Sequence, residues 1–248
     1  MNSVTPISIE MPKPRQLAIL IAALLIFMAA LLLWQQQALD DRLVVLHNQI
    51  YTNTALRSAF EAVSRYGMGF ISLSYAALVL LSFRDEALAS NRPLFLFIIF
   101  TFAIGSVSGD LMKEVFARAR PVVHLGNQIA NTTLSDSLAF PSGHATKSMS
   151  LALPFLLMAS GSIRTNQMFK VTQFTAAILV SYSRLALQRH YPSDILAGAA
   201  FGLLAVVIGA YIVNAMYRRQ GMDAEKLQRL SLPLTLIFTV LAVFLCVL

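Results

Sequence analysis

The amino-acid sequence predicts an all-α fold, a polytopic transmembrane helix bundle with six core helices and an extra C-terminal span. Three observations carry this prediction: hydrophobic residues form 57% of the 248, charged residues form only 12%, and long apolar runs recur along the chain. Soluble domains carry about 25% charged residues. A chain so poor in charge does not cover a water-facing surface, which excludes a soluble enzyme and a disordered protein.

The net charge of +7 and the single cysteine bear on which partners and which stabilising groups the protein has. The 19 basic residues are scattered between apolar runs and form no stripe, so a nucleic-acid partner is not expected. Basic loops are normal in membrane proteins. Cys246 alone excludes an internal disulfide and a multi-cysteine zinc site.

Seven apolar runs are long enough for a hydrocarbon core of roughly 30 Å. They cover residues 17–34, 66–83, 94–112, 145–163, 171–187, 195–217 and 232–248. The first run exceeds the apolar region of a signal peptide, and no small-residue cleavage site follows it, so we expect an uncleaved span. No internal repeat appears, and residues 1–248 form one domain with 218–248 as a C-terminal extension.

The connecting segments differ in character. Residues 83–93 and 160–170 are short, polar and basic, as expected for turns between antiparallel helices. In residues 40–65, apolar side chains recur at helical spacing, which predicts an amphipathic helix that lies at the interface and runs into the second span. Residues 122–140 form a polar loop of 19 residues, a length typical of functional loops.

Ionisable residues cluster at the end of the third span. Lys113 and Arg120 are seven residues apart, so a continuous helix would place both on one face, and Pro121 would then stop that helix. Ionisable groups at membrane helices are functional suspects. A basic anchor for topology is the alternative interpretation of this segment.

A second polar group, Pro141-Ser142-Gly143-His144, directly precedes the fourth span. Ser142 is a natural helix N-cap, and Gly143 lets backbone N–H groups approach a ligand. The start of a helix is an anion site, and His144 lies in its first turn. A plain capping turn with an interfacial histidine is the alternative.

The third group, Ser183 to Asp194, lies between the fifth and sixth spans and contains Arg184 and His190. Pro192 suits the first helical position, which makes Asp194 the third residue of that helix. From there the Asp194 carboxylate reaches back towards His190. An imidazole oriented by a carboxylate is a prepared nucleophile or base. A His–Asp pair that only holds the loop in place remains possible at this point. Tyr191 suggests an interface aromatic.

Counting spans places the three groups on one side of the membrane. Spans four and five cross and return, so the third group meets the end of span three and the start of span four. Three cations around a helix N-terminus predict a phosphate site. Two histidines supply a nucleophile and an acid.

Lys113-x6-Arg120-Pro121, Pro141-Ser142-Gly143-His144 and Ser183-Arg184-x5-His190-x3-Asp194 together resemble the three-part signature of the type 2 phosphatidic acid phosphatase (PAP2) superfamily. The signature region is 113–194, and every signature position matches. The resemblance implies a bacterial membrane lipid phosphatase. The substrates that it allows are undecaprenyl pyrophosphate, phosphatidylglycerol phosphate, phosphatidic acid and lipid A phosphates, and we expect residues 122–140 to discriminate among them.

The resemblance also implies roles for individual residues. His190 attacks phosphorus and forms a phosphohistidine, Asp194 holds its tautomer, and His144 protonates the leaving oxygen. The phosphoryl oxygens are held by Lys113, Arg120, Ser142, Gly143 and Arg184. The family needs no metal and no cofactor, and two histidines with one aspartate among cations make a poor metal site. The expected partners are a membrane lipid phosphate and the bilayer, with no obligatory protein partner.

Two alternative functions remain open from the sequence. A phosphotransferase of the same fold passes the phosphoryl group to a second lipid, and nothing in the residues separates it from a hydrolase. A lipid transporter predicts polar residues at the span centres, whereas the polar residues here gather at one end.

Basic residues in the loops predict the orientation. Ten cations lie on the amino-terminal side and nine on the other, of which Lys113, Arg120 and Arg184 are explained by catalysis. Ten cations on the amino-terminal side against six remaining cations on the other side predict a cytoplasmic amino terminus. The site is then expected to face the periplasm or exterior of a bacterial cytoplasmic membrane.

Overall fold

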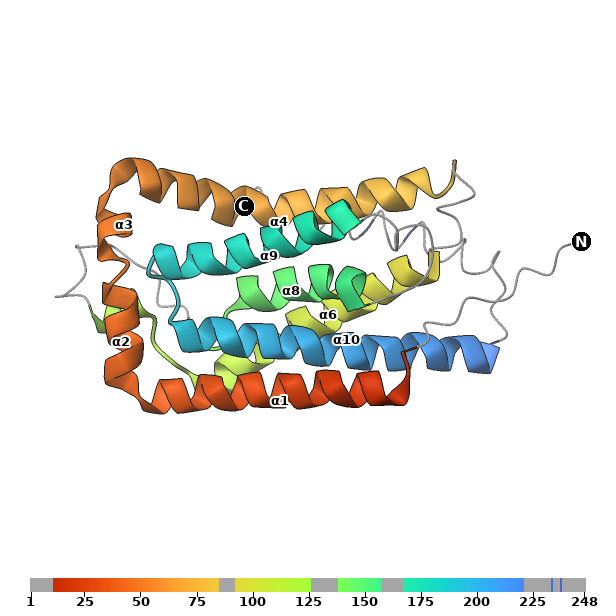
Figure 1. Ribbon diagram of the computed structural model, residues 1–248, viewed down its shortest axis with the longest axis horizontal. Helices are drawn as coiled ribbons and strands as arrows, with labels where there is room; N and C mark the ends of the chain where they lie inside the picture. The colour runs from red at the N-terminus through yellow and green to blue at the C-terminus, as the bar shows by residue number, and fades with distance from the viewer. Residues whose placement is uncertain are drawn as a thin grey trace, which may run out of the picture.

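In the part of the chain that the structure describes, six helices of 15 residues or more run side by side (Figure 1). The computed structural model describes residues 11–84, 92–125, 138–157 and 167–220, with the isolated residues 233 and 237. Every regular element in these ranges is a helix, which confirms the predicted fold class. The six helices are α1 (Lys13–Gln35), α4 (Thr54–Leu81), α6 (Arg92–Phe116), α8 (Gly143–Leu157), α9 (Gln167–Ala186) and α10 (Pro192–Gln220).

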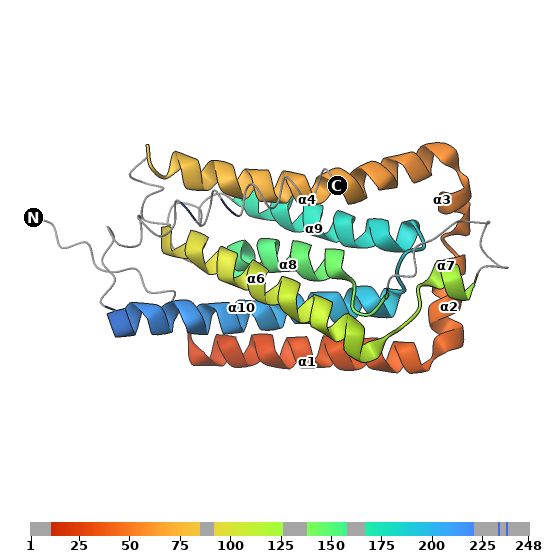
Figure 2. The ribbon, with the colours of Figure 1, turned by 180° about the vertical axis from the view of Figure 1, so that it is seen from behind.

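Three shorter helices lie at one end of these six (Figure 2). Helices α2 (Gln37–Val45) and α3 (Asn48–Thr52) connect α1 to α4, and α7 (Pro121–His124) follows α6. At this same end α6 and α9 finish, and α8 and α10 begin. The three polar groups of the sequence therefore meet at one end of the molecule, as predicted from the order of the spans.

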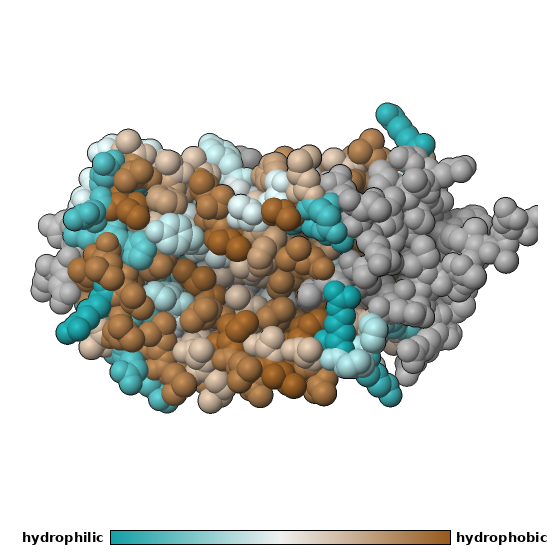
Figure 3. Space-filling model, in the orientation of Figure 1, coloured by the Kyte–Doolittle hydropathy of each residue, from teal (hydrophilic) through white to brown (hydrophobic). Residues whose placement is uncertain are grey.

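The outer surface is that of a membrane protein. Within the described residues, four helices are long and apolar enough to cross a membrane, α1 and α4 together with Leu94–Phe116 and Pro192–Met216. Large apolar side chains are exposed on these helices, such as Leu24 on α1, Phe70 on α4 and Ile208 on α10. Figure 3 shows hydrophobic residues across the middle of this face, with hydrophilic residues towards the ends. Such a face suits lipid tails rather than water.

Helix α8 is surrounded by α4, α6, α9 and α10. It is shorter than a typical span, and its apolar side chains Leu151 and Phe155 belong to the main core cluster. Helix α10 approaches it closely at Gly198, where a Cβ would lie 2.7 Å from the Ser142 carbonyl oxygen. At Gly202 a Cβ would lie 2.8 Å from that of Met149. These glycines bring the starts of α8 and α10 together, and with them the second and third polar groups.

Most of the predicted spans match helices in the structure. The amphipathic helix predicted over residues 40–65 is confirmed only from Thr54, where α4 runs without a break into the second span. The earlier part of the segment is divided into α2 and α3, so a single helix over the whole range is wrong. The 122–140 segment was expected to be loop throughout, but Pro121–His124 forms α7, because Pro121 begins a helix instead of ending one. The predicted run 232–248 and the end of the fourth run lie outside the described residues, apart from residues 233 and 237.

Candidate active site

A cavity of about 760 Å³ opens where the polar groups meet. Its lining includes most of the residues predicted for the site, namely Lys113, Arg120, Gly143, His144, Arg184 and His190. Ser142 and Asp194 are fully buried behind this lining. Helix α4 closes another side of the cavity with a polar face that includes Ser58, Ser64, Arg65 and Ser72.

Lys113 and Arg120 reach the cavity in a different way from the one predicted. Helix α6 ends at Phe116, and Ala117 follows it with a φ of 45°, in the left-handed region. Arg120 has extended backbone, so the two residues do not share a helical face. The extended segment is held by a bond from the Ala139 N–H to the Arg118 carbonyl at 2.8 Å. The predicted shared face is therefore wrong, although both side chains line the cavity.

The start of α8 has the geometry of an anion site. The Ser142 hydroxyl accepts a bond from the Ala145 N–H at 3.5 Å, as expected of an N-cap. The Ser142 N–H donates to the Asp194 carbonyl at 2.9 Å and so ties α8 to α10. A Cβ on Gly143 would lie 3.3 Å from the Lys113 ammonium nitrogen. Because Gly143 has no side chain, the cation and the helix N-terminus face the same space.

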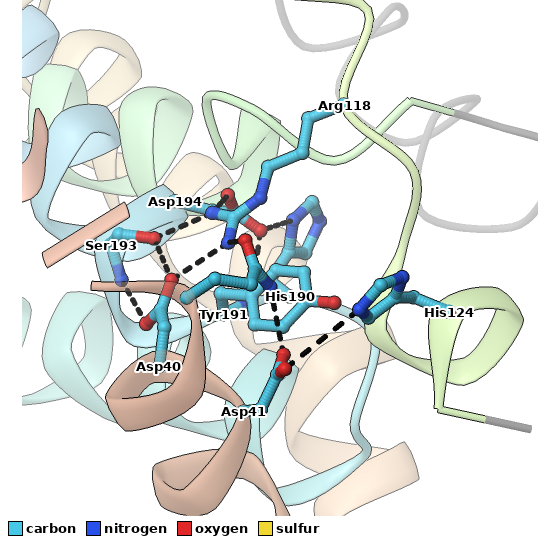
Figure 4. Close-up of polar contacts among 9 residues, drawn as sticks. Asp40, Asp41, Arg118, His124, His190, Tyr191, Ser193 and Asp194 are labelled. Carbon is cyan, nitrogen blue, oxygen red and sulfur yellow. Dashed lines mark hydrogen bonds and ion pairs between the residues drawn. The ribbon is translucent and has the colours of Figure 1, made fainter. Parts of the chain in front are cut away.

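His190 lies in the tight turn between α9 and α10 and is almost fully buried. The Asp194 carboxylate accepts a bond from the Tyr191 N–H at 2.8 Å, and the same oxygen, Oδ2, lies 3.4 Å from His190 Nδ1 (Figure 4). That separation is an ion-pair distance, longer than a good hydrogen bond. The predicted reach of Asp194 over the helix start towards His190 is confirmed.

The surroundings of His190 keep its ring neutral. Burial lowers the pKa of His190 well below its usual value, and the positive charges of Arg184, Arg120 and Lys113 lower it further. A neutral imidazole has a free lone pair, which a nucleophile or a base requires. Burial also lowers the pKa of the Arg120 guanidinium, and the neighbouring charge of Arg189 adds to this effect. The cavity is therefore crowded with positive charge.

Arg184 is buried at the end of α9 and connects the site to α4. Its Nη1 donates to the Ser64 hydroxyl at 2.6 Å. Its Nε has no hydrogen-bond partner within the described part of the chain. A buried donor without a partner costs free energy unless a ligand completes it. The guanidinium is thus fixed at one end by Ser64 and available to an anion along its other edge.

Sequence reasoning missed a buried polar network behind Asp194. Arg118 binds Asp194 and Asp40, each at 2.8 Å, and Ser193 binds both Arg118 and Asp40 (Figure 4). The expectation that Tyr191 is an interface aromatic is wrong, because its ring is buried and lies beneath the Arg118 guanidinium, 3.8 Å from ring centroid to Cζ. The signal that could have found Arg118 was its position, two residues before the signature residue Arg120 in the segment Arg118-Ala119-Arg120-Pro121.

Asp110 lies at the edge of the cavity, between two cations. One of its carboxylate oxygens is 3.4 Å from the ammonium of Lys113 and the other 3.6 Å from that of Lys147. It therefore holds the two lysines beside each other. Within the described residues, no group of three or more histidine, cysteine, aspartate or glutamate side chains has the geometry to hold a metal ion.

A neutral, carboxylate-oriented histidine among buried cations at a helix N-terminus defines a phosphoryl-transfer site. Its position at one end of a bundle with membrane-spanning helices defines the class of protein, a membrane-embedded phosphatase. Residues 94–219 match the family model of the PAP2 superfamily, and the chain belongs to that superfamily.

Several relatives share parts of the chain. An undecaprenyl-diphosphatase of Sulfolobus acidocaldarius is 28% identical over 156 residues, which cover 63% of this chain and 68% of that protein. A lipid A 1-phosphatase of Rhizobium johnstonii is 30% identical over 110 residues, covering 43% of this chain and 42% of its own length. The crystal structure of a PAP2-type phosphatidylglycerolphosphate phosphatase from Bacillus subtilis has the same fold, with a TM-score of 0.58 at 18% identity, covering 83% of this chain and 96% of that one.

Proposed function

We propose that this protein hydrolyses the phosphate or diphosphate group of a membrane lipid through a phosphohistidine formed at His190. The observation that supports this proposal most directly is the neutral, buried ring of His190, which lies against Asp194. The ring lines the same cavity as the cations Lys113, Arg120 and Arg184. Water and metal-bound hydroxide are not needed for the first step, because the imidazole is itself the nucleophile.

The chemistry proceeds in two steps. His190 Nδ1 faces Asp194, so Nε2 attacks phosphorus while the bond from phosphorus to the leaving oxygen breaks. Burial and the neighbouring cations lower the pKa of His144, and the negative charge of the bound phosphate offsets this effect. His144, protonated beside the phosphate, then donates a proton to that oxygen and releases the lipid product. His144 then takes a proton from a water molecule, which attacks the phosphohistidine and releases inorganic phosphate and neutral His190.

The cations hold the phosphoryl oxygens during both steps. Lys113 faces the N-terminus of α8 at Gly143, and Arg184 is fixed by its bond to Ser64. Their charges are in place before the reaction, so the site needs little reorganisation when negative charge develops in the transition state.

This proposal is tested with purified protein in detergent and a panel of undecaprenyl diphosphate, phosphatidylglycerol phosphate, phosphatidic acid and lipid A. The expected result is release of inorganic phosphate from at least one of them. Transfer of the phosphoryl group to a second lipid without free phosphate would instead identify the phosphotransferase. Release from none of the four would contradict the proposal.

The charge of the cavity favours a substrate with two adjacent phosphates. Besides the three signature cations, the lining includes Arg65, Lys147 and Arg189, against one acid, Glu61. Glu61 already pairs with Arg57 at 3.0 Å. Within the described residues, Arg65 and Arg189 have no carboxylate partner. Asp110 offsets one charge of the two lysines that it contacts. The six cations still exceed what one phosphate dianion neutralises, so a lipid diphosphate fits this lining better than a monophosphate.

We therefore predict that Arg65→Gln and Lys147→Gln each lower kcat/KM for farnesyl diphosphate about tenfold and change that for farnesyl phosphate less than about twofold. These residues lie outside the signature and would bind the phosphate that stays on the lipid. The two substrates differ only in that phosphate, and the measurement is phosphate release from each. Arg42→Gln, an exposed cation outside the lining, is the control. Equal losses on both substrates would contradict a second phosphate subsite.

We also propose that the amino terminus is cytoplasmic and that the cavity faces the periplasm or exterior of a bacterial cytoplasmic membrane. The excess of basic residues at the end opposite the cavity supports this orientation. An outward site suits an enzyme that acts on lipids of the outer leaflet.

A labelling experiment is expected to show this orientation. Thr54 is exposed at the cavity end and Lys13 is exposed at the other end. In a Cys246→Ser background, Thr54→Cys should react with a membrane-impermeant maleimide in intact spheroplasts, whereas Lys13→Cys should react only after lysis. The reverse pattern would place the site in the cytoplasm.

A further inference from the structure

Arg118 is buried between two carboxylates, Asp40 and Asp194, that lie far apart in the sequence. Its Nη1 donates to Asp194 Oδ1 and its Nη2 to Asp40 Oδ2, each at 2.8 Å (Figure 4). The Arg118 side chain is 5% exposed and both carboxylates are fully buried. A buried pair of this kind is strongly destabilised when one partner is lost. Neither aspartate is therefore a passive surface charge.

The position of the guanidinium is fixed from every side. Its plane lies over the Tyr191 ring at 3.8 Å and near the Trp34 ring at 5.1 Å. The Gln37 side-chain oxygen accepts a further bond from Nη2 at 3.3 Å. A planar fork with stacked faces has one orientation, which a lysine would not reproduce.

Asp40 also binds the first turn of α10. Its Oδ1 accepts a bond from the Ser193 N–H at 3.3 Å, and its Oδ2 accepts one from the Ser193 hydroxyl. Counting the bond from Arg118, both oxygens accept donors, and these bonds offset part of the burial, which raises the pKa of the Asp40 carboxyl. Helix α2 thereby touches the residue next to Asp194.

The charge of this cluster matches the charge change at His190. One arginine and two aspartates carry a net charge of −1. His190 is neutral before the reaction and becomes positive when its ring bonds to phosphorus. The cluster and the ring together are then neutral. Without Asp40, Arg118 would neutralise Asp194 alone, and the positive ring would lose its counter-charge.

We propose that Asp40 is a positioning residue for the phosphoryl transfer, acting through Arg118 to hold Asp194 and its negative charge against His190. The inference rests on the proposed function, since it requires His190 to become a cation. Asp40 lies outside residues 94–219, which match the family model, and so belongs to the part of the chain that the family model does not cover.

The test is Asp40→Asn in the full-length protein, with farnesyl diphosphate as substrate. The expected result is a kcat lower by about tenfold to a hundredfold with KM changed less than about twofold, because the lost interaction acts in the transition state. Inhibition by vanadate, whose five-coordinate form bonds to the histidine, should weaken by a similar factor. Inhibition by inorganic phosphate, which binds the cations alone, should stay within about twofold.

The matched control is Asp41→Asn, which removes the neighbouring charge of α2 but no group bound to Arg118. It should have the kcat and KM of the parent, and the same inhibition by vanadate and by inorganic phosphate. Ser193→Ala is the second variant, for use if Asp40→Asn does not fold; it removes two contacts of the network without a change of charge and should lower kcat by about threefold to tenfold.

Three results would overturn the inference. They are an unchanged kcat in a folded Asp40→Asn, the same loss in Asp41→Asn, or equal weakening of vanadate and phosphate binding. An inactive parent protein on every lipid would instead contradict the proposed function, and so the two failures are distinguishable.

Discussion

His190→Ala is expected to lower phosphate release by at least about a thousandfold, the largest effect of any single substitution here. In the proposed mechanism the imidazole is the attacking group, and within the described cavity lining the other imidazole, His144, is assigned the opposite task of proton donor. An alanine leaves the cations and the helix N-terminus in place. The variant should therefore still bind inorganic phosphate although it does not turn over substrate.

The measurement is phosphate release from the lipid that the parent enzyme hydrolyses best, with folding checked by gel filtration and thermal stability in the same detergent. His124→Ala is the matched control, because His124 is half exposed at the same end of the molecule, 3.8 Å from Asp41. Near-parental turnover in His190→Ala would remove His190 as the nucleophile.

Arg184→Lys is expected to lower kcat/KM by about a hundredfold although the charge is kept. The Arg184 guanidinium contacts α4 and is also available to substrate. Its Nη1 donates to the Ser64 hydroxyl at 2.6 Å, while the edge that contains Nε is open to a ligand. A lysine has one nitrogen and does not hold Ser64 and a phosphoryl oxygen in the same geometry. Buried space left by the smaller head group adds to the loss.

The control is Arg57→Lys, at the exposed start of α4, where the ion pair with Glu61 is solvated and worth little. Phosphate release by the two variants is compared under the same conditions. Parental activity in Arg184→Lys would show that this residue only anchors α9 to α4.

The sequence predicted those parts of the site that depend on short spacing. Pro192 sets the start of α10, and a carboxylate two residues later returns to the turn before the helix, so the approach of Asp194 to His190 follows from local geometry. Ser142 and Gly143 likewise follow from the requirements of a helix start.

The sequence did not predict contacts that depend on how distant helices pack. Asp40 and Arg118 are 78 residues apart, and an aspartate in an amphipathic segment has the same local pattern whether it faces water or a buried arginine. The end of α6 was missed for another reason. The helix stops at Phe116, and Ala117 takes the left-handed conformation usually left to glycine, so no residue type marks the boundary.

Helix α1 packs along α10, and Asp40 of α2 binds Ser193 in the first turn of α10. Both contacts therefore require α10 to have been made. During synthesis at about 5–20 residues per second, the ribosome needs roughly seven to thirty seconds to pass from α2 to Pro192. Throughout that interval α1 lacks the helix along which it packs most extensively, and Asp40 lacks its bonds to Ser193. Catalytic competence therefore arises late in biogenesis, when the sixth helix inserts beside the first, and a nascent chain released before that point carries most of the signature but no assembled centre.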